Sequence, residues 1–129
     1  MYTEQCGGGL ARQLADRYPK LEEKYRKYCE KHEYKYIELK GNVFFYNTNE
    51  NKFIANIFSQ VENFDTDYMA MAIALTDIKA KARERNMSIA IPYGIGCGIA
   101  NGEWDKVYQI IKDIFENSTI KCTLYKLEE

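Results

Sequence analysis

The sequence predicts a single α/β domain in which helices cover a layered sheet. Segments with helical spacing of apolar residues alternate along the chain with short runs of strand character. Several of these runs are continuously apolar, as in strands buried on both faces, and this alternation indicates a layered α/β fold. The chain has 129 residues, the size of one domain, and no repeat, linker or low-complexity segment divides it. We therefore expect residues 1–129 to form one domain.

The first third of the chain predicts two helices. The first covers Leu10–Tyr18, where apolar residues share one helical face. Pro19 ends this helix and suits the first turn of the next, because an N–H at that position would be unpaired in any case. In the second helix apolar residues recur at helical spacing at Leu21, Tyr25, Tyr28 and Cys29.

Strands dominate the next segment. Tyr36–Leu39 predicts a strand, which continues over Val43–Tyr46 after a turn signal at Gly41 and Asn42. Residues 47–51 are polar and predict another turn. The apolar run Phe53–Phe58 predicts a buried strand.

The second half alternates helix and strand. A long helix is predicted over Asp67–Arg85, with Asp65 or Thr66 as its N-cap. Ser88–Ile91 predicts a short strand that Pro92 closes, and a final strand is predicted over Ile120–Leu127. The apolar positions of the long helix, and of an amphipathic helix that begins at Trp104, are Tyr68, Met71, Ala72, Leu75, Ile78, Ala82, Trp104, Val107, Tyr108, Ile111, Ile114 and Phe115.

Composition disfavours several classes of protein. The formal charge of −1 disfavours sequence-independent nucleic-acid binding, which needs a cationic surface. No apolar run reaches the ~20 residues of a membrane span, and the N-terminus has no signal-peptide pattern, so we expect a cytoplasmic protein. The four cysteines are widely spaced without a Cys-x-x-Cys pair, which indicates reduced thiols and no zinc or redox site. We expect neither a metal nor a cofactor.

Two glycine-rich stretches each precede a predicted helix. Gly94–Gly102 holds four glycines in nine residues and no lysine, arginine or histidine, and Gly7–Gly9 leads directly into Leu10. Glycine permits positive φ and close approach of a ligand, and a helix N-terminus adds unpaired N–H donors and a partial positive charge. An isolated triplet more often makes only a tight turn. Two such loops favour one ligand with two phosphates, or with a phosphate and a ribose.

Two familiar phosphate motifs do not fit these loops. The P-loop requires Gly-Lys-Ser/Thr, but Gly102 is followed by Glu103 and Trp104. The dinucleotide fingerprint requires Gly-x-Gly-x-x-Gly in the first strand–helix turn, whereas residues 94–98 have another spacing and lie late in the chain.

Several separated motifs together resemble macro domains, closest to the bacterial and phage-type branch that includes proteins of ADP-ribose 1″-phosphate processing. "IAIPYGIGCGIANGEWDKVYQII" is similar to the second phosphate loop of that branch and its following helix. "CGGGLARQLADRYP" is similar to the first loop and helix. "FIANIFSQ", "TDYMAMAIALTDIKAKA" and "IKCTLYKL" agree with the family in order and spacing, so the resemblance covers nearly the whole chain.

The resemblance implies a three-layer α/β/α sandwich with a mixed sheet and a pocket for ADP-ribose. It also implies that Phe58 and Tyr93 are apolar walls of the pocket, although core packing is favoured for Phe58. The residues that would surround the diphosphate and distal ribose are Gly7, Gly8, Gly9 and Leu10 on one side and Gly94, Ile95, Gly96, Cys97, Gly98 and Ile99 on the other.

The sequence also departs from the family pattern. Macro domains usually carry two strands before the first loop, with an acid that reads adenine and an asparagine near the distal ribose, and here residues 1–6 precede the glycines. We expect an upstream segment of a longer chain, closure of the sheet, or a second copy in a homo-oligomer to fill that place. The hydrolase branch uses a lysine and an aspartate where this sequence has Ser59 or Gln60, and Ala100. Removal of ADP-ribose from acidic side chains is therefore disfavoured.

No acid–base pair stands out among the chemical candidates. His32 lies among charges at a helix end, and Cys97 and Cys6 beside the glycine loops lack the arginine that a cysteine phosphatase needs, which for Cys97 would stand at Glu103. Glu62, Asp65 and Asp67 form an acidic cluster, of which the two aspartates are better explained by a helix start. Trp104 is expected to anchor its helix, and Asn56 is the unusual polar residue of an apolar strand. The catalytic residues are unknown.

Three functional classes are compatible with these residues. The first is an ADP-ribose-binding macro domain that reads ADP-ribosylated macromolecules or acts as a slow hydrolase or phosphatase. The second is a dedicated ADP-ribose 1″-phosphate phosphatase. The third, favoured least, is another nucleotide-binding α/β protein such as an NAD-dependent oxidoreductase.

Overall fold

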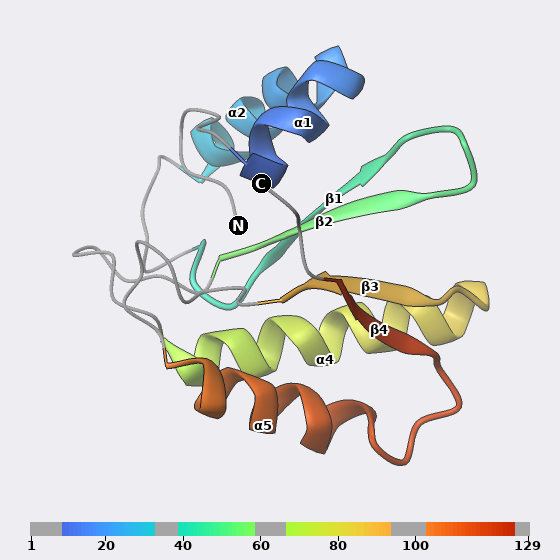
Figure 1. The fold of residues 1–129 in the computed structure, drawn as a ribbon. Helices are drawn as coiled ribbons and strands as arrows, with labels where there is room; N and C mark the ends of the chain where they lie inside the picture. The colour runs from blue at the N-terminus through green and yellow to red at the C-terminus, as the bar shows by residue number, and fades with distance from the viewer. Residues whose placement is uncertain (1–8, 33–38, 59–66, 94–102, 126–129) are drawn as a thin grey trace.

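The protein folds in three layers, with strands between two pairs of helices (Figure 1). A computed structural model describes residues 9–32, 39–58, 67–93 and 103–125. Helices α1 (Gly9–Arg17) and α2 (Pro19–Lys31) form one outer layer, and α4 (Tyr68–Arg85) and α5 (Trp104–Phe115) form the other. The predicted α/β/α sandwich is confirmed.

The first two helices form as the sequence predicts. Pro19 occupies the first turn of α2, where its missing N–H costs nothing. The face of α2 that carries Leu21, Tyr25 and Cys29 is buried against the strands β1 (Val43–Asn47) and β2 (Phe53–Ile57). These helices therefore cover one face of the β1–β2 hairpin.

The β1–β2 hairpin is antiparallel, with Val43 opposite Ile57 and Asn47 opposite Phe53. Its turn lies within the predicted polar segment, where Asn49 and Asn51 adopt left-handed backbone conformations, which asparagine accepts more readily than most residues.

The connection into β1 corrects the prediction of a strand ending at Leu39. Leu39 is helical, and residues 36–38 of that prediction lie outside the described residues. The turn at Gly41 and Asn42 is confirmed: Gly41 has a φ of 86°, and the Asn42 N–H donates to the Leu39 carbonyl (2.8 Å). The Leu39 side chain is buried against the hairpin, which explains an apolar residue there without a strand.

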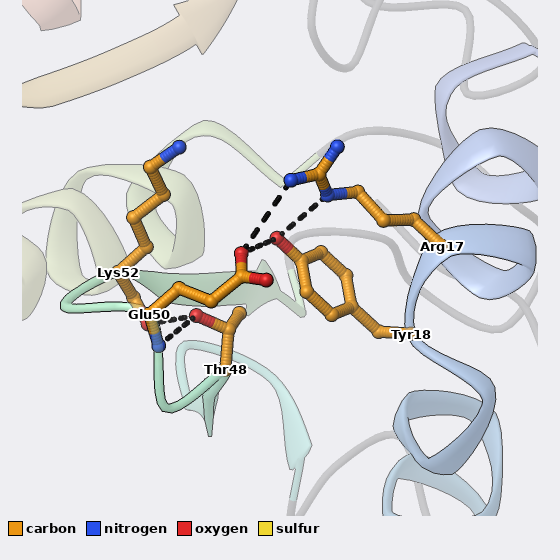
Figure 2. Close-up of polar contacts among 5 residues, drawn as sticks. All are labelled: Arg17, Tyr18, Thr48, Glu50 and Lys52. Atoms are coloured by element: carbon orange, nitrogen blue, oxygen red, sulfur yellow. Dashed lines mark hydrogen bonds and ion pairs between the residues drawn. The ribbon is translucent and has the colours of Figure 1, made fainter.

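Polar contacts tie the hairpin turn to the α1–α2 junction, as Figure 2 shows. The Arg17 Nε donates to the Tyr18 hydroxyl (3.0 Å), which in turn donates to Glu50 Oε2 (2.9 Å). Within the turn, the Glu50 N–H donates to Thr48 Oγ1 (3.2 Å), and Thr48 Oγ1 donates to the Lys52 carbonyl (2.9 Å). Hydrogen bonds within the turn therefore fix its conformation, and the contacts with Arg17 and Tyr18 connect it to α1.

The N-cap of helix α4 lies one or two residues later than predicted. Its N-cap is Asp67, whose carboxylate accepts the Ala70 N–H (2.9 Å), and Asp65 and Thr66 lie outside the described residues. At the other end Asn86 adopts a left-handed C-cap conformation with a φ of 54°. Apolar residues of α4 face the strands, and Ala70, Met71, Ala74, Leu75 and Ala82 are buried.

Strands β3 (Ile89–Pro92) and β4 (Cys122–Tyr125) pair in parallel, joined through α5. Both are shorter than predicted, since Ser88 and residues 120–121 lie outside the ladder and residues 126–127 outside the described part of the chain. In α5 the predicted apolar face is confirmed by buried Val107, Ile111 and Phe115. Tyr108, by contrast, is 46% exposed, because it lies at the margin of that face.

The described strands form two separate two-stranded sheets, β1–β2 and β3–β4. The predicted mixture of antiparallel and parallel pairing is present, but within the described residues no ladder joins β2 to β3. Ile57 of β2 and Ile91 of β3 nevertheless share one buried cluster with Met71 and Leu75 of α4. Helix α4 therefore holds the two sheets side by side.

Candidate functional site

One edge of the molecule gathers the features that bind anions in α/β proteins. Strands β2, β3 and β4 end there, and α4 and α5 begin there (Figure 1). Open α/β sheets bind ligands beyond the carboxyl ends of their strands, where helix N-termini present free N–H groups. We call this the carboxyl edge.

The first turns of α4 and α5 are fixed to each other at the carboxyl edge. The Glu103 N–H donates to the Tyr68 hydroxyl (2.9 Å), and Lys106 lies 5.4 Å from the Tyr68 ring centre while pairing with Glu103 (3.3 Å). Asp67 caps α4 and pairs with Lys40 (3.1 Å). The Ala70 N–H, and then Lys40, hold the pKa of Asp67 below its usual range.

Aromatic side chains flank the segment between β3 and α5. The Tyr93 ring lies 4.5 Å from that of Trp104, which lies 6.0 Å from that of Tyr108. Tyr93 is 53% exposed, while Trp104 packs against the core. The expected anchoring role of Trp104 is confirmed, and a role of Tyr93 as a ligand wall stays a prediction.

Solved structures share this arrangement over almost the whole chain. A macrodomain protein from Streptomyces coelicolor is 25% identical, with a TM-score of 0.79 over 98% of this chain and 82% of that chain. This chain has the macrodomain fold. The macrodomain of Mycobacterium tuberculosis DarG is similar in fold, at 24% identity and a TM-score of 0.79 over 97% of this chain and 83% of its own. A Bacteroides thetaiotaomicron protein of unknown function has a TM-score of 0.83 at 26% identity, over 96% and 81% of the two chains.

No protein-family model and no curated protein matches this chain. The macrodomain likeness therefore comes from three-dimensional structure, and it agrees with the resemblance that the separated sequence motifs indicate.

The glycine loops of this chain lie largely outside the described residues. Tyr93 and Glu103 bound the second loop at the carboxyl edge. Gly9 and Leu10 are the first two residues of α1, which confirms that the first loop leads directly into a helix. Ligand contact by these loops stays a prediction, and the predicted site residues outside the described part are Gly7, Gly8, Gly94, Ile95, Gly96, Cys97, Gly98 and Ile99.

The other candidate residues either have structural roles or lie outside the described residues. His32 is the C-cap of α2, 4.8 Å from the Tyr28 ring, which agrees with a structural role. Phe58 stacks on Tyr25 at 5.8 Å, so core packing is confirmed for it. Glu62, Cys6, Ser59, Gln60 and Ala100 lie outside the described residues.

The structure also shows a feature that the sequence indicated without explaining. Asn56 on β2 is only 4% exposed, and its Nδ2 has no hydrogen-bond partner within the described part of the chain. The sequence signal was a polar residue inside an apolar strand. The Tyr68–Glu103 hydrogen bond had no such signal, because it joins residues 35 positions apart.

Two negative findings apply to residues 9–32, 39–58, 67–93 and 103–125. No group of three or more histidine, cysteine, aspartate or glutamate side chains is arranged to hold a metal ion. No helix in these ranges is long and apolar enough to cross a membrane.

Proposed function

We propose that this protein binds ADP-ribose, or a derivative that keeps its diphosphate, at the carboxyl edge. The observation that carries the proposal is the convergence of the ends of β2 and β3 with the first turns of α4 and α5. The segment that bridges Tyr93 and Glu103 contains the second glycine loop, so that loop begins and ends at this edge. The macrodomain fold supports the same ligand class.

The second glycine loop suits an anion although it has no cationic side chain of its own. Residues 94–102 contain no lysine, arginine or histidine, so backbone N–H groups would have to neutralise a phosphate. Glycine allows successive N–H groups to converge on one oxygen, and the first turn of α5 adds unpaired donors. On this proposal Gly7, Gly8, Gly9 and Leu10 contact the ligand from one side, and residues 94–99 contact it from the other.

Calorimetry with ADP-ribose, ADP-ribose 1″-phosphate, NAD and ATP tests the proposal. We expect ADP-ribose or its 1″-phosphate to bind most tightly, because both keep the diphosphate and distal ribose that two loops can hold. Preference for NAD would instead favour an oxidoreductase.

The Gly96→Asp variant tests the position of the ligand. It places a side chain and a negative charge where phosphate oxygens should lie, and each lost hydrogen bond to a charged group costs on the order of 1.5–3 kcal/mol. We expect no measurable binding. Thr119→Asp is the matched control, since it adds the same charge to an exposed residue in the connection between α5 and β4. Equal affinities of Gly96→Asp and the wild type would overturn the proposal.

On this proposal, hydrolase chemistry at the site is slow or absent. Because Ser59, Gln60 and Ala100 stand where the hydrolase branch has its lysine and aspartate, we expect no release of ADP-ribose from modified carboxylates. A slow release of phosphate from ADP-ribose 1″-phosphate is compatible with water positioned by the backbone and the substrate. Rapid turnover of an automodified protein substrate would contradict this part of the proposal.

We also propose two partners for this function. ADP-ribosylated macromolecules would present the ligand to the carboxyl edge, and a second copy of the chain would associate in a homo-oligomer. The support for the second is the separation of the described strands into two sheets.

A further inference from the structure

Asn56 combines almost complete burial with an unused donor. Its side chain is 96% shielded from solvent, as the 4% exposure shows, and Nδ2 has no hydrogen-bond partner within the described residues. A buried donor that has given up water without a replacement destabilises the folded state, which is why such groups are rare and need an explanation. An apolar residue of the same size would suit an apolar strand better.

The neighbouring side chains of Asn56 within the hairpin offer no hydrogen-bond acceptor for its amide. Phe44 lies directly opposite on β1, and Ile54 and Phe58 precede and follow it on the same face of β2. Tyr28, which packs over Phe44 and Phe58, has its hydroxyl hydrogen bonded to Asn42. Above this face of the hairpin lie the buried apolar side chains of α2.

Asn56 also lies close to the carboxyl edge. It is the residue before Ile57, the last of β2, and Ile57 shares a buried cluster with Ile91 near the end of β3. The unused donor therefore belongs to a residue one position from the strand end. Its face of the hairpin is also the face that α1 covers.

We propose that the Asn56 side-chain amide is a ligand-binding group, whose Nδ2 donates a hydrogen bond to an oxygen of the bound ADP-ribose-type molecule. This inference rests on the proposed function, and it adds a side chain to a site otherwise built from backbone groups. On this proposal the amide gains its hydrogen bond only when the ligand binds, and the unpaired donor destabilises the ligand-free protein.

The Asn56→Leu variant separates a binding role from a structural one. Leucine keeps the size of the side chain and removes the unpaired donor, so the folded protein should melt at the same temperature or higher. ADP-ribose should bind about tenfold or more weakly, because one hydrogen bond to the ligand has been lost. Affinity and stability then change in opposite directions, which a structural residue would not produce.

Two further variants keep this test decisive. Ile54→Leu is the matched control, a size-conserving change on the same face of β2 and farther from the strand end, and it should bind normally. Asn56→Ala removes the same donor with a smaller side chain, and it serves if the leucine variant fails to fold. The ligand series ADP-ribose, ADP and AMP then locates the acceptor: an equal loss for ADP-ribose and ADP assigns it to the diphosphate, and a loss for ADP-ribose alone assigns it to the distal ribose.

The outcomes distinguish this inference from the function on which it rests. Wild-type binding with unchanged affinity in Asn56→Leu and Asn56→Ala overturns the role of Asn56 and leaves the proposed function standing. Absence of any binding by the wild type overturns both. Weakened binding together with a marked fall in melting temperature in both Asn56 variants also overturns the inference, because Asn56 would then be a structural residue.

Discussion

Asp67 shows how one residue positions the carboxyl edge. Its carboxylate caps α4 through the Ala70 N–H (2.9 Å) and pairs with Lys40 (3.1 Å), with only a fifth of the side chain exposed. Because these contacts favour the charged form, the pKa of Asp67 is lower when the protein is folded than when it is unfolded. Its contribution to stability is therefore present at neutral pH and lost as the pH falls below about 4 toward the folded pKa.

Asp67→Ala should therefore lower the free energy of unfolding at neutral pH by about 1 kcal/mol, the usual cost of removing an N-cap. The difference from the wild type should shrink in urea titrations repeated at about pH 3, because the carboxylate is then mostly protonated in the unfolded chain. Asp67→Asn is the control, because asparagine also caps helices but carries no charge toward Lys40. A destabilisation by Asp67→Ala that is as large at pH 3 as at pH 7 would show that the carboxylate charge is irrelevant.

Prediction of single residues succeeded where the residue type alone determines the role. It failed where several adjacent residues could fill the same role. Asp65, Thr66 and Asp67 are all good capping residues, and the sequence alone does not show that Asp67 is the one used. Asn56 was identified as unusual from sequence, but its missing partner depends on what lies across the strand and above it. No local pattern contains that information.

At the scale of elements, the turn of the β1–β2 hairpin depends on contacts within the turn and on a contact with α1. The asparagines at 49 and 51 shape the turn, and the Tyr18 hydroxyl links it to α1 through Glu50 (Figure 2). The sequence predicted this turn because polar residues interrupt two apolar runs. It could not predict the tie to Tyr18, which is 32 residues away from Glu50.

Tyr18→Phe should loosen the turn without unfolding the protein. The variant keeps the ring, which lies 6.1 Å from that of Tyr46, and removes only the hydroxyl that bridges Arg17 and Glu50. Because these polar groups are exposed, the melting temperature should change little. Hydrogen exchange at residues 48–52 should become faster than in the wild type. Unchanged exchange there would show that the bridge does not hold the turn.

The prediction of a strand at Leu39 failed for a reason that belongs to this scale. A short apolar run has no distinguishing period, so a buried helical turn and a strand produce the same pattern. Leu39 is buried beneath Tyr25 and Phe44 in one cluster, and burial alone explains its apolar side chain. The long helices α4 and α5, whose period repeats over several turns, were predicted correctly.

At the scale of the whole molecule, the three layers followed from the alternation of elements, and the pairing of strands did not. Each layer requires only that each helix or strand has an apolar face, and the local sequence of the element determines that face. Pairing joins residues far apart, such as Ile89 with Cys122, and nothing local encodes it. The division into two sheets therefore became visible only in the structure.

The two inner edges of these sheets differ in their capacity to pair with another strand. The Thr48 N–H donates to the Lys52 carbonyl, and the Phe58 N–H donates to the Asn42 carbonyl. Because hydrogen-bonded and non-hydrogen-bonded pairs alternate along an antiparallel ladder, the peptide groups of Phe53, Ala55 and Ile57 point away from β1. On β3, the Ile89 and Tyr93 N–H groups bond to β4, which leaves Ala90 and Pro92 on the other side. Proline has no N–H, so the edge of β3 is a poor template, whereas the edge of β2 is a good one.

We therefore predict that the protein self-associates through the free edge of β2, and that Ala55→Pro prevents this. Proline at residue 55 removes an N–H that points away from β1, so the β1–β2 ladder keeps its own hydrogen bonds. Light scattering over a concentration series should show assemblies larger than a monomer for the wild type and monomers for Ala55→Pro. Circular dichroism of the variant, with a melting curve close to the wild-type one, establishes that it remains folded. A wild-type protein that stays monomeric at every concentration, or a variant that associates equally well, would show that the edge of β2 is satisfied within one chain.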